Sequence, residues 1–148
     1  MSDLMNQSFL WGVATSGYQS EGGFNSEHAP KNNWFWSEKK GSVMSTGDAA
    51  EFWTRYEEDF QLCQQMGLSA FRLGLEWARI QPSAEVHVDR VPEFDFAALD
   101  AYSNLIAACR RYGLEPIVTL HHFTHPAWLG IDAWLMPETV DHFVRYVR

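Results

Sequence analysis

Residues 9–23 read FLWGVATSGYQSEGG, and this stretch carries the strongest fold signal in the chain. Its first part, residues 9–16, is an apolar run that suits a β-strand, and it ends in small residues and glycines. Gln19 follows, with glycines on both sides of it. An amide side chain both donates and accepts hydrogen bonds, which suits the recognition of adjacent hydroxyl groups. We therefore predict a buried first strand followed by a turn that presents Gln19.

Strand-like and helix-like segments alternate along the rest of the chain. Short apolar runs bounded by turn residues predict further strands at residues 69–76 and 115–121. Apolar residues at helical spacing predict helices over residues 48–66, 95–112 and 137–148. Asp48 and Asp95 are expected to cap the first two helices, and Gly67 and Gly113 are expected to end them. The third helix is expected to run to Arg148.

This alternation predicts an α/β fold with a parallel sheet and right-handed crossovers. The pattern alone leaves two architectures open, a doubly wound sheet and a segment of a barrel. The glycines after the first strand lack the spacing of a dinucleotide-binding loop, and no Walker-type lysine follows them, which disfavours nucleotide binding. Residues 24–47 are expected to be irregular, and a connection of that length is uncommon unless it carries a function.

Composition narrows the possible partners and location. The chain has 148 residues, enough for one ordinary domain, and a formal net charge of −8 without a basic cluster. Nucleic acids and anionic membranes are therefore disfavoured partners. Residues 1–8 do not resemble a secretory signal, and no apolar run approaches the roughly 18 residues of a membrane span. Cys63 and Cys109 form no metal or redox motif, so we expect a cytoplasmic location.

Four blocks resemble the family 1 glycoside hydrolases, the β-glucosidase-like retaining enzymes, in the order typical of that family. They are residues 9–23, residues 70–82 (AFRLGLEWARIQP), residues 116–129 (PIVTLHHFTHPAWL) and residues 134–140 (WLMPETV). The resemblance covers essentially the whole chain. It implies that residues 1–148 are the N-terminal part of a single (β/α)8 TIM barrel, namely its first three strand–helix units, with the remainder of the barrel absent.

The same resemblance implies roles for individual residues. Gln19 and His122 look like the residues that bind sugar hydroxyls, and Arg72 looks like the arginine that supports the catalytic nucleophile. A fixed cation beside a carboxylate favours the ionised form of that carboxylate. Phe123 stands where many members carry tryptophan and would line the sugar site, and Trp128 would line the site entrance. Each of these residues also has a purely structural interpretation, as a turn, ion-pair or core residue.

The remaining histidines, Glu76 and most tryptophans are interpreted as structural residues, and not as metal ligands, catalytic groups or sugar platforms. His121, His122 and His125 suggest a metal site, but adjacent histidines on a strand point to opposite faces and no acid or cysteine completes a known spacing. No metal or cofactor is expected. Glu76, where many family members carry serine, is interpreted as a structural or supporting residue and not as the catalytic acid. Five tryptophans are interpreted as core or interface residues: Trp11, Trp34, Trp36, Trp53 and Trp134.

The chain lacks the motifs that supply the family's chemistry. Retaining glycosidases need two carboxyl groups about 5 Å apart, one as nucleophile and one as acid and base. In this family they come from an Asn-Glu-Pro block after strand four and from a glutamate near strand seven, and neither motif occurs here. We therefore expect no catalytic carboxyl group within the chain, and expect both of them to lie beyond Arg148.

These observations lead to one expected function and one alternative. We expect a full-length protein that hydrolyses terminal β-O-glycosidic bonds with retention, and no activity from residues 1–148 alone. The alternative is a fragment that binds a saccharide or another partner without catalysis.

Overall fold

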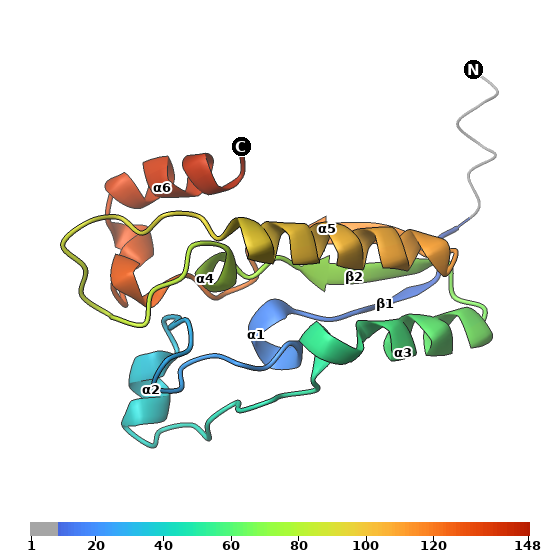
Figure 1. Ribbon diagram of the computed structural model, residues 1–148, viewed down its shortest axis with the longest axis horizontal. Coiled ribbons are helices and arrows are strands. Elements are labelled where there is room, and N and C mark those ends of the chain that lie inside the picture. The colour runs from blue at the N-terminus through green and yellow to red at the C-terminus, as the bar shows by residue number, and fades with distance from the viewer. Residues whose placement is uncertain (1–8) are drawn as a thin grey trace.

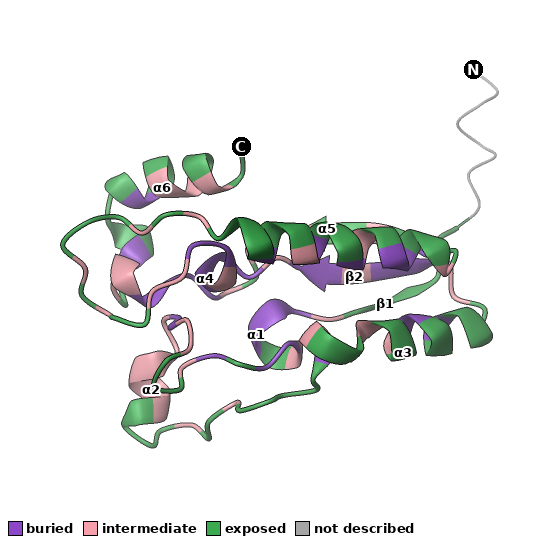
Figure 2. Ribbon diagram, in the orientation of Figure 1, coloured by how far each residue is buried: buried purple, intermediate pink, exposed green. Residues whose placement is uncertain are grey.

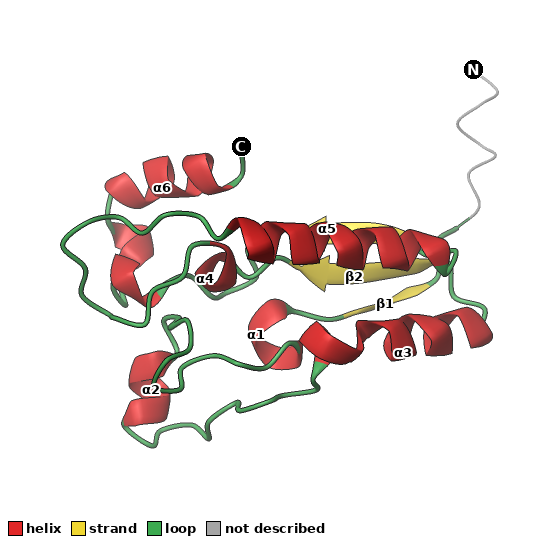
Figure 3. Ribbon diagram, in the orientation of Figure 1, coloured by secondary structure: helices red, strands yellow, loops and turns green. Residues whose placement is uncertain are grey.

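The structure, a computed structural model, describes residues 9–148, and its elements follow the expected alternation (Figures 1 and 3). The strands are β1 (Gly12–Ala14), β2 (Ala70–Gly74) and β3 (Glu115–Thr119). The α-helices are α1 (Gly17–Ser20), α2 (Phe35–Lys39), α3 (Phe52–Gln65), α4 (Trp77–Ile80), α5 (Phe96–Arg111) and α6 (Glu138–Tyr146). Two 3-10 helices, η1 (Ala127–Leu129) and η2 (Ala133–Leu135), lie between β3 and α6.

The three strands form one parallel sheet in the order β1-β2-β3, which confirms the predicted parallel α/β arrangement. In the register of the sheet, Arg72 of β2 lies between Ala14 of β1 and Ile117 of β3. Each strand is followed by a helix of nine or more residues, namely α3, α5 and α6. The carboxyl ends of all three strands therefore meet at one edge of the sheet, where parallel sheets place their functional residues.

The main core lies between β2 and the helices α3 and α5. Alternate residues of a strand point to opposite faces, so Phe71 and Leu73 reach this core and Arg72 points to the other face. The Phe71 ring stacks on Phe52 with centroids 5.6 Å apart and meets Phe60 edge-on at 5.0 Å. The burial colouring in Figure 2 shows β2 as the most buried strand, with the outer faces of α3 and α5 exposed.

The prediction of a buried first strand was wrong in two respects. β1 has three residues instead of eight, and all three are exposed. Phe9 and Trp11, which precede it, expose 74% and 67% of their surface. The reason is position: β1 and β3 are the two edges of this sheet, so each pairs on one side among the described residues. Ile117 of β3 is 46% exposed for the same reason.

The boundaries of α3 and α5 confirm some predicted signals and correct others. Asp95 caps α5, because its carboxylate accepts from two amides of the first turn at 2.9 and 3.1 Å. Gly67 and Gly113 follow their helices with φ of +72° and +76°, as predicted. Asp48 does not cap α3, which begins four residues later, after Glu51 with a left-handed φ of 54°. The Asp48 carbonyl instead closes a turn by accepting from the Glu51 amide at 2.8 Å.

The last helix ends earlier than predicted. The pattern predicted a helix that runs to Arg148, whereas α6 ends at Tyr146 and Arg148 is an exposed residue outside any helix or strand. Its last turn is closed by the Val147 amide, which donates to the Phe143 carbonyl at 3.0 Å. Apolar spacing predicts which residues share a face of a helix, but a helix ends where its carbonyls stop finding amide donors one turn further on. The prediction was therefore wrong by two residues at this end.

Residues 24–47 are more ordered than the sequence pattern predicts, because they include α2. This connection pairs with the loop that follows β3, through an isolated antiparallel bridge between Asn32 and Pro126. It therefore brings two distant segments together at the functional edge of the sheet. Within residues 9–148, no helix has both the length and the apolar character that crossing a membrane requires.

Candidate functional site

An open pocket of about 540 Å³ is formed by segments that follow the carboxyl ends of β1 and β3. Helix α1 contributes Tyr18 and Gln19, and the loop after β3 contributes Phe123. The connection at residues 24–47 contributes Trp34 and three side chains between residues 43 and 46. Segments roughly 100 residues apart in the sequence, such as those of Gln19 and Phe123, therefore share one cavity.

Three aromatic rings form a wall of this pocket. Tyr18 and Trp34 stack with centroids 5.8 Å apart, and Phe123 meets Trp34 edge-on at 5.7 Å. The Tyr18 hydroxyl donates to Glu38 of α2, and burial raises the pKa of Tyr18 to about 12, so this hydroxyl stays neutral. Trp34 packs against the buried cluster of Tyr18, Phe24 and Ala78, as predicted for a core residue, but the prediction did not include its place on the pocket wall. Its position in an unusually long connection was the available signal.

Gln19 lies on the single-turn helix α1 and not in a turn at the strand end. Its side chain is exposed, and the Ser16 hydroxyl donates to its amide oxygen at 2.7 Å. Gly17, at the start of the same helix, permits a close approach to β2. A Cβ at Gly17 would lie 2.8 Å from the Cβ of Glu76, so any larger residue would push α1 away. The local sequence thus determines where Gln19 can sit.

The other candidate sugar ligands are placed differently. His122 is exposed and its ring lies 5.0 Å from that of Phe123, but it is outside the set of pocket-lining residues. Trp128 lines a separate hollow of about 310 Å³, where it meets His142 edge-on, and its indole N–H donates to the Gln81 carbonyl at 3.2 Å. The structure therefore brings Gln19 and Phe123 together, puts His122 beside them, and leaves Trp128 elsewhere. Their sugar-binding roles stay predictions.

Arg72 occupies the centre of β2, on the face opposite α3 and α5. Its side chain is half-buried, and its Nε atom is buried without a hydrogen-bond partner among residues 9–148. Buried guanidinium nitrogens normally find an acceptor, because an unpaired buried donor is costly. Arg72 is thus positioned to receive an anionic or carbonyl oxygen, which its predicted role beside a carboxylate would supply.

The reacting carboxyl groups are expected beyond Arg148, and so their place relative to Arg72 and Gln19 lies outside the described residues. Arg148 itself follows α6. It is not among the residues that line the Gln19 pocket or the hollow beside Trp128. The expectation that both catalytic groups follow Arg148 therefore stays a prediction.

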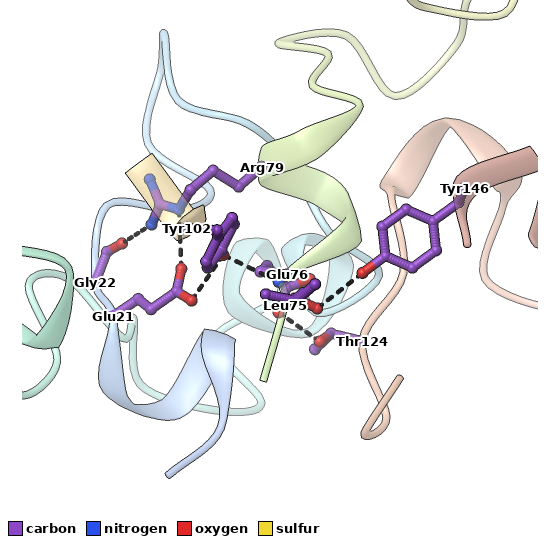
Figure 4. Close-up of polar contacts among 8 residues, drawn as sticks. All are labelled: Glu21, Gly22, Leu75, Glu76, Arg79, Tyr102, Thr124 and Tyr146. Atoms are coloured by element: carbon purple, nitrogen blue, oxygen red, sulfur yellow. Dashed lines mark hydrogen bonds and ion pairs between the residues drawn. The ribbon is translucent and has the colours of Figure 1, made fainter. Parts of the chain in front are cut away.

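Figure 4 shows a largely buried polar network in which Glu21, Arg79 and Tyr102 take part. Arg79 of α4 donates to the carboxylate of Glu21 at 2.8 Å and to the carbonyl of Gly22 at 2.7 Å. Its guanidinium also packs over the rings of Phe24 and Trp53, at 4.4 and 4.0 Å from their centroids. This ion pair joins the segment after β1 to the helix after β2, and the sequence pattern did not predict it.

Glu76 forms the second half of this network. Tyr102 connects the two halves, because its hydroxyl donates to Glu21 at 2.7 Å and accepts from the Glu76 amide at 3.0 Å. The Glu76 carboxylate accepts from Thr124 at 2.6 Å (Figure 4). Burial raises the pKa of the Glu76 carboxyl to about 7. Neither Glu21 nor Glu76 is among the residues that line the Gln19 pocket.

Two of the three neighbouring histidines, His121 and His125, make hydrogen bonds with different partners. His125 is buried, and its Nε2 lies 2.9 Å from the Gly130 carbonyl. His121 accepts from the Trp134 indole at 3.3 Å, and burial lowers the pKa of both His121 and His125. Among the described residues, no three acidic, histidine or cysteine side chains are grouped so that they could hold a metal ion.

Comparison with known proteins places this geometry in context. The family model of Glycosyl hydrolase family 1 matches residues 1–148. The chain is 34% identical over 141 residues to 6-phospho-beta-galactosidase 1 of Streptococcus pneumoniae, covering 95% of this chain and 29% of that protein. It superposes on the crystal structure of beta-glycosidase BGL167 with a TM-score of 0.77 and 40% identity, covering 93% of this chain and 31% of the other. For the beta-glycosidase from Pyrococcus horikoshii the TM-score is 0.76 and the identity 33%, with 94% and 30% covered. The chain thus spans under a third of the length of these relatives.

Proposed function

Because this chain belongs to glycosyl hydrolase family 1 and forms three strand–helix units of that family's (β/α)8 barrel, we propose that it is part of a retaining β-glycosidase. The proposed reaction is the hydrolysis of terminal β-O-glycosidic bonds. One observation carries the proposal: Gln19 and Phe123, which follow different strands, line one pocket at the carboxyl edge of the sheet. Barrel enzymes of this kind build their active sites at that edge.

The proposed roles follow from the chemistry of each side chain. Gln19 and His122 would exchange hydrogen bonds with neighbouring sugar hydroxyls, since both can donate and accept. Phe123 and Trp34 would pack against the apolar face of the sugar ring. Arg72, whose Nε lacks a partner among residues 9–148, would lie beside the nucleophilic carboxylate and favour its ionised form.

The two reacting carboxyl groups are proposed to lie beyond Arg148, in the part of the family's length that residues 1–148 do not cover. We therefore propose that the 148-residue chain alone is inactive and that it needs neither a metal nor a cofactor when completed. Trp128 would line the entrance of the completed site. The buried free thiols of Cys63 and Cys109 are compatible with the cytoplasmic location that we also propose.

The proposed substrates are gluco- or galacto-configured β-glycosides. The name of the Streptococcus pneumoniae relative adds one specific alternative, a galactoside phosphorylated at position 6. The pocket wall does not decide between them, because its lining combines aromatic and aliphatic side chains with the Gln19 amide and two hydroxyl groups. Both classes of sugar therefore belong in the test.

The first prediction concerns a chimera in which this chain replaces the matching 31% of beta-glycosidase BGL167. We expect the chimera to hydrolyse an aryl β-glucoside or β-galactoside, or its 6-phosphate, with retained anomeric configuration observed by NMR. A metal chelator should leave the rate unchanged. The isolated chain should give no measurable turnover under the same conditions. An inverted product, or no hydrolysis of any β-glycoside, would contradict the proposal.

The alternative function, saccharide binding without catalysis, is favoured by the absence of the family's two catalytic motifs from the sequence. It predicts a saturable calorimetric signal when glucose or cellobiose is added to the isolated chain. A signal of that kind, together with an inactive chimera, would replace the hydrolase proposal by the binding proposal.

The second prediction tests Gln19 in the chimera. Replacing Gln19 with alanine removes about two hydrogen bonds to the sugar, so we expect kcat/KM to fall about 100-fold. The matched control is Gln61→Ala, because Gln61 is an exposed glutamine on the outer face of α3. Equal kcat/KM values for the two variants would remove Gln19 from the proposed site.

A further inference from the structure

We infer that Glu76 is a positioning residue of the proposed sugar site: through its hydrogen bond with Thr124 it holds the loop that carries His122 and Phe123 against the carboxyl end of β2. The inference rests on the proposed function. It assigns a role to a buried carboxyl that lies outside the pocket lining and that the proposed mechanism does not use.

The backbone of Glu76 is held by hydrogen bonds at both its carbonyl and its amide. Glu76 directly precedes α4, and its carbonyl accepts from the amides of Arg79 and Ile80 at 2.9 and 3.1 Å. Its own amide donates to the Tyr102 hydroxyl, which is in turn held by Glu21. The residue is 2% exposed. Its backbone is therefore anchored by α4 and α5, and its side chain leaves from a defined point.

The side chain of Glu76 contacts the loop after β3 through Thr124. Thr124 is buried, and its hydroxyl donates to Glu76 Oε2 at 2.6 Å. Thr124 directly follows Phe123 and lies two residues after His122. A displacement of Thr124 would therefore move both candidate sugar ligands. The other oxygen, Glu76 Oε1, is buried without a partner within residues 9–148. The hydrogen bond from Thr124 therefore orients the Glu76 carboxyl group.

On its other side, the loop makes three hydrogen bonds with Asn33. The Asn33 amide donates to the His125 carbonyl at 3.0 Å, and its side-chain oxygen accepts from the His125 amide at 3.0 Å. Its side-chain NH₂ also donates to the Phe123 carbonyl at 3.4 Å. The loop is thus held between Asn33, which belongs to the connection forming the pocket wall, and Glu76, which belongs to the end of β2. Without the Glu76 side chain, the loop would lose the hydrogen bond between Thr124 and the end of β2, but it would keep its hydrogen bonds with Asn33.

Hydrogen–deuterium exchange of the 148-residue chain tests the inference without requiring activity. We expect Thr124→Val, and equally Glu76→Ala, to increase exchange at residues 121–126 about tenfold. Glu76→Gln should restore slow exchange, because its amide oxygen can still accept from Thr124. The matched control is Thr139→Val: Thr139 is 1% exposed and donates to the Ala133 carbonyl at 2.6 Å, in a different part of the fold. Equal exchange at residues 121–126 in the Thr124 and Thr139 variants would overturn the inference.

Kinetics in the BGL167 chimera then separates positioning from simple destabilisation. We expect Thr124→Val to raise KM about tenfold and to change kcat by no more than about threefold. The double variant Glu76→Ala/Thr124→Val should have the same KM as either single variant, because each substitution removes the same Thr124–Glu76 hydrogen bond. Thr139→Val should leave KM unchanged at a comparable loss of stability. An inactive unsubstituted chimera counts against the proposed function alone, whereas an active chimera in which the Thr124 and Thr139 variants share one KM counts against the positioning role.

Discussion

Replacing Arg79 with leucine is expected to lower the free energy of unfolding of the chain by about 3–5 kcal/mol, the usual cost of removing one partner of a buried ion pair. The side chains of Arg79 and Glu21 are 12% and 1% exposed, and they are joined at 2.8 Å. Without Arg79 the Glu21 carboxylate would stay buried without its cation. Burial already raises the pKa of Glu21, and Arg79 is the largest influence opposing that rise. The variant also loses the packing of the guanidinium over Phe24 and Trp53.

Urea unfolding measures this effect, and two further variants make it specific. Glu21→Gln combined with Arg79→Leu should recover part of the loss, because no uncompensated charge remains. Arg55→Ala is the control: Arg55 pairs with Glu51 and Glu58 on the exposed face of α3, and its removal should change the urea midpoint far less. If Arg79→Leu and Arg55→Ala shift the midpoint equally, the buried pair does not stabilise the fold.

The second large expected effect is a dependence of stability on pH that Glu76→Gln removes. Burial raises the pKa of the Glu76 carboxyl from 4.5 to about 7 in the folded chain. Between these values the folded state keeps a proton that the unfolded state releases, so the free energy of unfolding falls as the pH rises from about 4.5 to about 7. The loss is complete above pH 7 and amounts to about 3 kcal/mol, at 1.36 kcal/mol for each pKa unit.

Glu76→Gln stays neutral at every pH and keeps the acceptor for Thr124. The variant and the parent chain should therefore be similarly stable near pH 4.5, and the variant should be more stable by up to about 3 kcal/mol at pH 8. The difference between their curves isolates Glu76 from the other groups around it, which are Glu21, Arg79, Tyr18, Tyr102 and Tyr146.

Glu58→Gln is the control for the pH experiment. Hydrogen bonds from Arg55 lower the pKa of the exposed Glu58 carboxyl, so its contribution has the opposite sign: it is present at neutral pH and fades as the carboxyl is protonated in acid. A parent-minus-variant difference for Glu76→Gln that does not change between pH 4.5 and pH 8 would show that this carboxyl is not held neutral by its surroundings.

The sequence by itself determined the order and type of the main elements and the family. Apolar periodicity and end signals are properties of neighbouring residues, so α3, α5, β2 and β3 were predictable from the spacing of their side chains. The Asp95 cap and the glycine at position 67 belong to the same class, because a cap needs only amides two or three residues away. The four sequence blocks indicated the family because a motif is recognised from the order of its residues alone, and the family model matches residues 1–148.

Only the tertiary structure decided which side chains meet and which are covered. Glu21 and Arg79 are 58 residues apart, and Trp34 and Phe123 are brought to one pocket wall by pairing between the connection and a loop after β3. The burial of β1 could not be read from its apolar composition either, because burial depends on what packs against a strand. At the edge of a three-stranded sheet, those apolar side chains stay exposed. Local pattern sets the elements, whereas solvent exclusion, pKa shifts and buried ion pairs arise from neighbours that are distant in the chain.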